Sequence, residues 1–316
     1  MTPSIAITAE VNSMNKPNLI VIVGPTAIGK TSLSLDLASH FQTEILSADS
    51  RQFFKEMSIG TAAPTPTELS KAPHHFIHHI SIEDDYSVGD FEKEALTKLE
   101  ELFQTHDTVI MVGGSGLYVD AVTKGLDKFP KVDESIRVNL NQELHTKGIE
   151  NLQQQLKELD PQYFSEADIQ NPHRLIRALE ICIGTGKPYS SFRKNEAAKR
   201  PFNNIFIGLD AERQTVYDRI NQRVDIMAQE GLIEEARKLY DKRGLNALNT
   251  VGYKELFKYF DGEWSQEHAI EEIKKNTRRF AKRQFTWFRK NEQINWFNYT
   301  TPSKEIISFL ESKTQS

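Results

Sequence analysis

The stretch LIVIVGPTAIGKTSLSLDLA, residues 19–38, decides the fold class of this chain. It opens with an aliphatic run, residues 19–23, of the kind found in a strand that is buried on both faces. A glycine loop follows, and the apolar residues over residues 30–38 then take helical spacing. We therefore predict a strand, a phosphate-binding loop and a helix in direct succession.

The loop sequence GPTAIGKT matches the P-loop template, whose glycines let backbone amides turn toward a phosphate at a helix start. Lys30 would neutralise phosphate oxygens, and the Thr31 hydroxyl would ligate Mg²⁺, the expected cofactor. A bare pattern match can be accidental, but this one has the strand and the helix that the motif requires. The predicted phosphate-binding residues are Gly24, Pro25, Thr26, Ala27, Ile28, Gly29, Lys30 and Thr31.

The loop alone leaves open whether its phosphate is transferred or departs as a leaving group. Nucleotide hydrolases place a magnesium-binding aspartate after a second aliphatic strand, but the best candidate strand, residues 108–112, is followed by GGS. Another predicted strand, residues 44–48, delivers Asp49 at its carboxyl end, where parallel sheets bind ligands. Asp49 there is a helix cap, a general base or a metal partner, and small-molecule kinases use such an aspartate too.

The wider pattern predicts an α/β fold with a parallel sheet, helices on both faces and an all-helical insertion. A fourth strand is expected at residues 204–209. Asp210 is then expected to cap a helix that ends at Gly231, and a final helix is expected over residues 266–290. The predicted parts are a flexible tail at 1–16, a core at 17–130 and 196–316, and a helical insertion at 131–195.

Composition bounds the setting in which the chain works. The formal net charge of -5 disfavours non-specific nucleic-acid binding by the whole surface but leaves room for a local basic face. No apolar run approaches the roughly 20 residues that span a bilayer, and the polar opening lacks a secretory pattern, so we expect a cytosolic protein. Cys182 is the only cysteine, and we expect it to be a buried apolar residue.

Eight blocks along the chain resemble the tRNA dimethylallyltransferase (isopentenyltransferase) family. In order they are GPTAIGKT, SADSRQ, APHHFI, VGGSGLY, RLIRALEICIGTGKP, YDRINQRVDIMAQEGLIEEA, TVGYKEL and AKRQFTWFRK. The resemblance implies transfer of a dimethylallyl group from its diphosphate to the exocyclic amine of the adenine on the 3′ side of the anticodon. The implied partners are the tRNA anticodon stem-loop and dimethylallyl diphosphate, with no membrane, and we expect a monomer.

The chain departs from the family pattern at two positions. Ile28 stands where serine is usual, and Ser115 replaces a threonine but keeps a hydroxyl. Four histidines also suggest a metal cluster, but the resemblance accounts for the first two without zinc, and no cysteine or well-spaced carboxylate joins them. We therefore disfavour a metal site at His74, His75, His78 and His79.

Breaking an allylic carbon–oxygen bond places negative charge on the diphosphate and positive charge on the carbon fragment, so positive groups and a dry slot are needed. By resemblance, Lys30, the loop amides and Arg223 supply the charge. Arg223 could instead be a solvated arginine beside the apolar stripe of its helix. Asp49 is the candidate base for the amine proton, and Thr26 would bind a phosphate or place the base.

The target adenine must be turned out of its stack to reach such a site. Basic stretches on the insertion, including residues 193–200, and in KKNTRRFAKRQFTWFRK fit this task, because Phe280, Trp287 and Phe288 interleave with the cations of the second. A charge run is more often a solvated face. The predicted tRNA contacts are Asp49, Ser50, Arg51, Gln52, Ser115, Arg137, His173, Arg174, Leu175, Ile176, Arg177, Gly252, Tyr253, Lys254, Lys282 and Arg283.

Two other functions remain open on the residues alone. One is a P-loop small-molecule kinase in which Asp49 is the base, and the other is a nucleotide-gated RNA-binding module without catalysis. Prenylated adenosine, consumption of ATP with a small acceptor, and binding without product distinguish the three.

Overall fold

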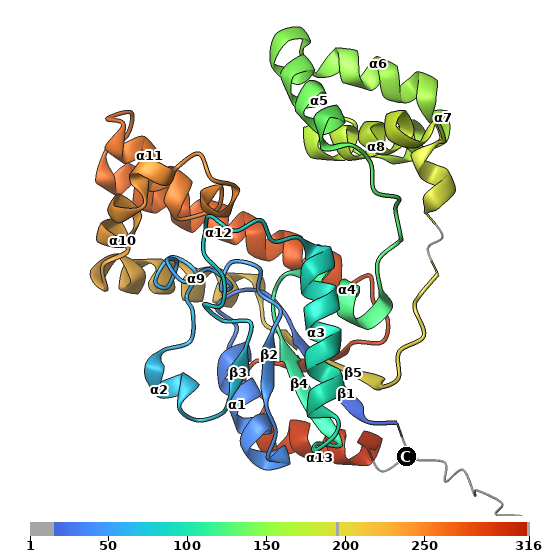
Figure 1. The fold of residues 1–316 in the computed structure, drawn as a ribbon. Helices are drawn as coiled ribbons and strands as arrows, with labels where there is room; N and C mark the ends of the chain where they lie inside the picture. The colour runs from blue at the N-terminus through green and yellow to red at the C-terminus, as the bar shows by residue number, and fades with distance from the viewer. Residues whose placement is uncertain (1–15, 194–195, 315–316) are drawn as a thin grey trace, which may run out of the picture. The chain divides into compact units, whose positions relative to one another are not determined.

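The structure is a computed structural model that describes residues 16–193 and 196–314. The chain forms two compact units (Figure 1): a core unit, Met1–Thr123 with Arg200–Ser316, and a helical unit, Lys124–Lys199. Apart from residue 16, the predicted tail lies outside the described residues. None of the helices in the described ranges combines the length and the apolar character that crossing a bilayer requires.

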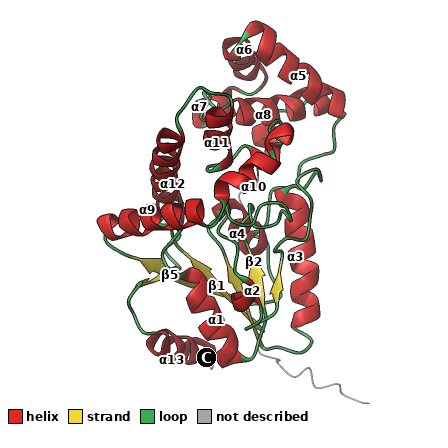
Figure 2. Ribbon diagram, turned by 90° about the vertical axis from the view of Figure 1, so that its left-hand side faces the viewer, coloured by secondary structure: helices red, strands yellow, loops and turns green. Residues whose placement is uncertain are grey.

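The core unit contains a six-stranded parallel sheet with the strand order β3-β2-β4-β1-β5-β6 (Figure 2), which confirms the predicted fold class. The strands are β1 (Asn18–Val23), β2 (Ile45–Ser47), β3 (His74–His75), β4 (Thr108–Val112), β5 (Asn203–Asp210) and β6 (Asn295–Asn298). The sequence did not predict the edge strands β3 and β6. They are too short and too polar to show a strand period.

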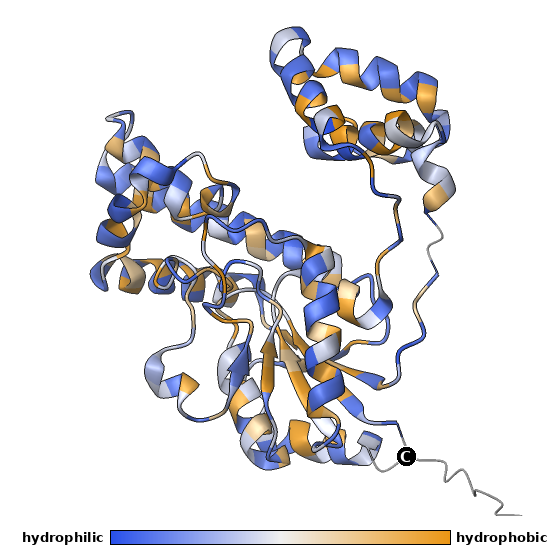
Figure 3. Cartoon of the chain, in the orientation of Figure 1, coloured by the Kyte–Doolittle hydropathy of each residue, from blue (hydrophilic) through white to orange (hydrophobic). Residues whose placement is uncertain are grey.

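Helices cover both faces of this sheet, and the strands between them are the most apolar part of the unit (Figure 3). Leu19 and Val21 pack into one core cluster with α3 and α4, while Ile20 and Ile22 pack into another with α1, α9 and α13, as the two-residue period of a strand requires. These helices are α1 (Lys30–Phe41), α3 (Val88–Leu102), α4 (Gly116–Lys124), α9 (Arg213–Gln229) and α13 (Ser303–Thr314).

A third core cluster joins α9 to α10, α11 and α12 through Val224, Leu232, Leu256 and Ile273. The additional helices of the core unit are α2 (Pro66–Leu69), α10 (Leu232–Lys238), α11 (Tyr253–Phe260) and α12 (Gln266–Phe288). The expected cap at Asp210 is wrong. Helix α9 begins after Glu212, because Asp210 still pairs in β5 and its carboxylate accepts hydrogen bonds from Ala211 N–H and Arg289.

The helical unit contains α5 (Glu134–Lys147), α6 (Ile149–Leu159), α7 (Pro161–Glu166) and α8 (Pro172–Thr185). The Asp133 carboxylate accepts the Ser135 N–H at 2.8 Å and caps α5. Leucines of α5, α6 and α8, among them Leu140, Leu156 and Leu179, form a core of their own. Cys182 is buried on α8, as predicted.

Candidate active site

The phosphate loop runs from the end of β1 to the start of α1. Gly24 and Gly29 have φ of +144° and +107°, and a Cβ on Gly24 would lie 2.7 Å from the Leu209 carbonyl oxygen, so neither position suits a larger residue. Ala27 also has a positive φ, +64°, and Arg219 Nε donates to its carbonyl at 2.7 Å. An arginine of α9 thereby holds the loop in a conformation that alanine rarely adopts.

Three charged side chains meet at this loop. Burial lowers the pKa of Lys30 to about 8, Asp49 partly opposes that shift, and Arg223 adds to it. Burial raises the pKa of Asp49, although Arg51 N–H, Lys30 and the two arginines Arg51 and Arg223 favour its ionised form. The lysine and the carboxylate therefore both have pKa values displaced from the ordinary range, as is frequent at catalytic sites.

Arg223 reaches the phosphate loop from α9. Its Nη1 donates to Thr26 Oγ1 at 3.4 Å, and burial lowers the pKa of its guanidinium. Arg223 is thus not a solvated surface arginine. The side-chain ammonium of Lys30 donates to the Pro25 carbonyl at 2.8 Å. Both cations lie where a diphosphate on the loop would need them.

The turn after β2 carries the candidate base. Asp49 Oδ1 accepts Arg51 N–H at 3.2 Å, and Ser115 Oγ accepts Ser50 N–H at 3.1 Å. Gln52 is committed inside the protein, because its amide contacts Ser47 and the carbonyls of residues 61 and 62. The guanidinium of Arg51 likewise donates to backbone carbonyls of residues 246 and 247. The turn is therefore rigidly held, and the predicted residues 49–52 and 115 are brought together.

A cavity of about 770 Å³ opens over the phosphate loop. Thr26, Lys30, Asp49 and Arg223 line its polar part. Its apolar part is formed by Ile59, Ala62, Ala63, Pro64, Pro66, Leu69, Ile77, Ile226 and Met227. This combination suits a ligand with an anionic head and a short hydrocarbon tail.

Sequence reasoning missed one group that shapes this cavity. The Glu235 carboxylate, on α10, accepts N–H groups of Ser58, Ile59 and Gly60 at 2.8–3.0 Å and the Tyr253 hydroxyl at 2.7 Å. It holds in place the segment that forms part of the apolar wall. Nothing in the sequence relates Glu235 to residues 58–60, which lie some 175 positions earlier.

The predicted tRNA contacts divide by exposure. In the core unit, Lys254, Lys282 and Arg283 are exposed, whereas Gly252 and Tyr253 are buried. In the helical unit, Arg137, His173 and Arg174 are exposed and Arg177 is partly exposed. Burial corrects the prediction for Leu175, Ile176 and Tyr253, whose side chains belong to the cores of their units and do not face solvent.

The basic stretches differ in the same way. Phe280 and Trp287 are exposed on α12, but Phe288 is buried and unavailable for stacking. Arg200 donates to the carbonyls of residues 121 and 122 and pairs with Glu92 at 2.6 Å, so it has a structural role. Lys194 lies outside the described residues.

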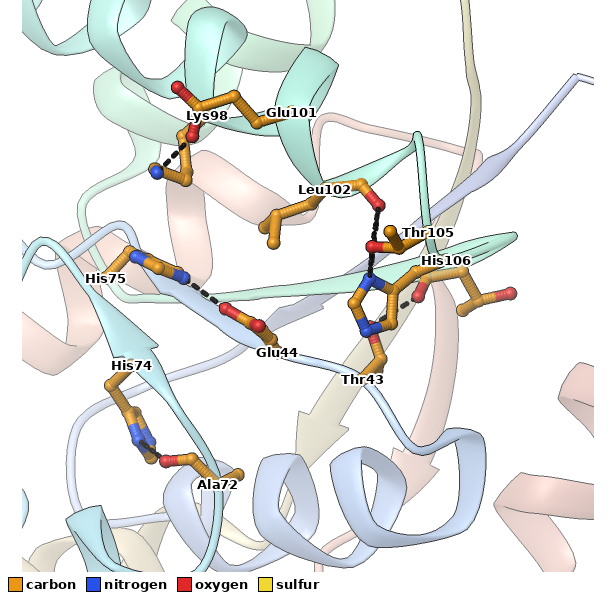
Figure 4. A network of polar contacts seen from close by, with 11 residues as sticks. Thr43, Glu44, Ala72, His74, His75, Lys98, Glu101, Leu102, Thr105 and His106 are labelled. Atoms are coloured by element: carbon orange, nitrogen blue, oxygen red, sulfur yellow. Dashed lines mark hydrogen bonds and ion pairs between the residues drawn. The ribbon is translucent and has the colours of Figure 1, made fainter.

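The four histidines have separate surroundings. His74 Nδ1 lies 2.8 Å from the Ala72 carbonyl, and His75 Nε2 lies 2.6 Å from the Glu44 carboxylate (Figure 4). His78 contacts Ser58, and His79 packs edge-on against aromatic rings. Within the part of the chain that the structure describes, no group of three or more His, Cys, Asp or Glu side chains could hold a metal ion.

The residues at the loop do fit a magnesium ion that a diphosphate helps to bind. Thr31 and Asp49 line the same cavity and offer a hydroxyl and a carboxylate, the oxygen ligands that Mg²⁺ prefers. Mg²⁺ typically uses few protein ligands and completes its shell with phosphate oxygens and water. Thr31 would therefore hold the ion together with the substrate.

Comparison with known proteins gives one answer throughout. A family model described as IPP transferase matches residues 52–291. A tRNA dimethylallyltransferase of Christiangramia forsetii is 65% identical over 93% of this chain and 98% of its own length, and one of Flavobacterium johnsoniae is 57% identical over 94% and 98%.

Solved structures agree. The tRNA isopentenylpyrophosphate transferase of Bacillus halodurans is 39% identical with a TM-score of 0.71, covering 95% of this chain and 97% of that one. A eukaryotic dimethylallyltransferase acting on tRNA, 24% identical over 95% of this chain and 80% of its own, has a TM-score of 0.82 and shows the same fold. With its phosphate loop, paired cations and neighbouring carboxylate, the chain is a transferase that belongs to the IPP transferase family, that of the tRNA dimethylallyltransferases.

Proposed function

We propose that this transferase moves a dimethylallyl group from dimethylallyl diphosphate to the exocyclic amine of the adenine on the 3′ side of the anticodon in tRNA. One observation carries the proposal: the phosphate loop, two buried cations and a carboxylate line the polar part of a cavity whose remaining wall is apolar. The diphosphate would lie on the loop and the prenyl tail against the apolar wall. The diphosphate is then a leaving group, which answers the question that the loop sequence left open.

Donor binding would use Lys30, Arg223 and the amides of residues 24–31. As the allylic carbon–oxygen bond breaks, the diphosphate leaves with the electron pair, and these groups stabilise its growing negative charge. Bound Mg²⁺, held with the Thr31 hydroxyl, would neutralise further charge on the diphosphate oxygens. Thr26, whose hydroxyl contacts Arg223, would keep that arginine at the phosphates.

Asp49 would act on the acceptor. The adenine amine is a weak nucleophile, so its proton must be removed as the new carbon–nitrogen bond forms. Asp49 would take that proton, and because burial raises the pKa of its carboxyl group, it is a stronger base than an exposed aspartate. Ser50 and Ser115 would hold the turn that aims it.

The tRNA would be bound by the exposed cations of both units. Everting the adenine costs about a few kcal/mol, which contacts to the anticodon loop must supply. The candidates with exposed side chains are Arg137, His173, Arg174, Arg177, Lys254, Lys282 and Arg283. Leu175, Ile176, Gly252 and Tyr253 would support them from within. A tRNA substrate places this work in the cytosol, and we expect a monomer to carry it out.

The test is incubation with undermodified tRNA, Mg²⁺ and dimethylallyl diphosphate, followed by mass analysis of the nucleosides. The expected product is a prenylated adenosine with release of one diphosphate per transfer. Consumption of ATP with a small acceptor would identify a kinase, and tRNA binding without any product would identify a binding module. Either result would refute the proposed function.

A further inference from the structure

The side chain of Gln284 joins two loops of the site. Gln284 lies on α12, far from β1 and β4 in the sequence, and is only 5% exposed. Its Oε1 accepts Thr26 N–H at 2.9 Å, and its Nε2 donates to the Gly114 carbonyl at 2.9 Å. Because one partner can only donate and the other can only accept, the orientation of the amide group is determined.

The approach of this amide requires the glycine at its partner. A Cβ on Gly114 would lie 2.2 Å from Gln284 Nε2, well inside contact distance. The same helix contacts the loop again one turn later, where a Cβ on Gly116 would lie 2.3 Å from the Trp287 ring. The segment that follows β4 is therefore shaped to receive α12.

The connection continues to the candidate base. Ser115, next to Gly114, accepts Ser50 N–H at 3.1 Å through its hydroxyl and donates its own N–H to the Ala48 carbonyl at 3.4 Å. Asp49 lies between those two residues of the turn. A chain of hydrogen bonds thus leads from Thr26 in the phosphate loop, through Gln284 and the loop after β4, to the turn that carries Asp49.

We propose that Gln284 is a positioning residue for prenyl transfer, which fixes the phosphate loop and the Asp49 turn at the separation that the reaction needs. This inference rests on the proposed function. The donor would be held at one end of the hydrogen-bond chain and the acceptor's base at the other. A displacement of about 1 Å between reacting groups can cost about a hundredfold in rate. Gln284 itself contacts neither substrate, so it acts through its two backbone partners.

The first test compares Gln284→Met with Gln266→Met. Both replace an amide by a thioether of similar length on α12, but Gln266 lies in the exposed first turn of the helix. With the folded fraction measured by circular dichroism, we expect kcat of Gln284→Met to fall about tenfold or more, because two buried hydrogen bonds are lost. The Kd for tRNA should stay within about twofold of wild type, and Gln266→Met should match wild type.

Gly114→Ala breaks the same link from the other side and provides a second route if Gln284→Met folds poorly. If both substitutions act through one contact, the double variant should lose no more activity than the worse single variant. An unchanged kcat in the folded Gln284→Met protein would overturn the proposal. So would a loss of tRNA affinity as large as the loss of kcat, because Gln284 would then serve tRNA binding.

Hydrogen–deuterium exchange tests the link without the reaction. In Gln284→Met, peptides covering residues 24–31 and residues 113–116 should both exchange faster than in wild type, while Gln266→Met should change neither. Failure of the wild-type protein to prenylate tRNA would refute the proposed function, whereas unchanged exchange in Gln284→Met would refute the link by itself. Faster exchange confined to one of the two segments would refute it as well.

Discussion

The charges beside the phosphate loop and those of the helical unit are held in opposite ways. Lys30 and Arg223 are directed at the loop, and burial lowers the pKa of each. On the helical unit, Arg137 and Arg177 pair with buried Glu180, yet their side chains are 54% and 42% exposed. Buried charges act at short range on one bound group and depend on geometry, whereas exposed charges act through a field that salt screens. The four predictions below test this contrast.

Replacing Asp49 should have the largest effect. Asp49→Ala removes the general base, so kcat should fall about a thousandfold or more, within the range that such catalysis contributes. Affinity for inorganic diphosphate should be nearly unchanged, because the cations that bind it remain. Single-turnover assays and calorimetric titration measure the two quantities. Activity retained in Asp49→Ala would remove this residue from the role, and the isosteric Asp49→Asn controls for packing.

Lys30 should show how burial makes a charge sensitive to pH. With a pKa of about 8, Lys30 is protonated below that pH and loses its charge as the pH rises through it, so donor affinity should weaken there. Lys30→Ala should lower kcat/KM about a hundredfold at neutral pH, a loss typical of one missing anion-stabilising group. Titration of donor affinity against pH measures the effect. Lys30→Arg stays charged, and in that variant the alkaline loss should disappear.

Exposed cations of the helical unit should give smaller, salt-dependent effects. Arg174→Ala should lower tRNA affinity about three- to tenfold at low salt and reduce the slope of log Kd against log salt by about 0.7–0.9. The KM for the prenyl donor should not change. Filter binding across a salt series measures the slope, with Arg213→Ala on α9 as a surface control. An unaltered slope in Arg174→Ala would contradict a phosphate contact.

Glu180 should matter least for chemistry and only for the stability of its unit. Burial raises the pKa of its carboxyl group, but hydrogen bonds from Arg137 and Arg177 outweigh that and leave it lowered. A lowered pKa adds stability above the pKa of the unfolded state, and this stability is lost as the pH falls through the folded-state pKa. Glu180→Ala should cost about 1–2 kcal/mol in urea unfolding, because both arginines can hydrate. Unchanged stability would show that the pair is dispensable.

The parts of the fold that were predictable are those whose information is local. The aliphatic run of β1, the glycine loop and the helical spacing of α1 lie within twenty residues, and the structure follows them. The heptad-like leucines of the helical unit were equally readable. The edge strands were not, since β3 is two residues long and exists only because His74 and His75 pair with β2. The same holds for Asp210, which pairs with β6 instead of capping α9.

The site shows the same division. The sequence by itself determined the phosphate loop and the residue types around it, because glycine, lysine and threonine at that spacing have a chemistry that needs no distant partner. Only the tertiary structure decided that Arg223 faces Thr26, that Leu175 and Ile176 are buried, and that Gln284 joins Thr26 to Gly114. Those facts depend on contacts between residues up to 258 positions apart. Such contacts arise from the packing of whole helices against the sheet, which no local pattern encodes.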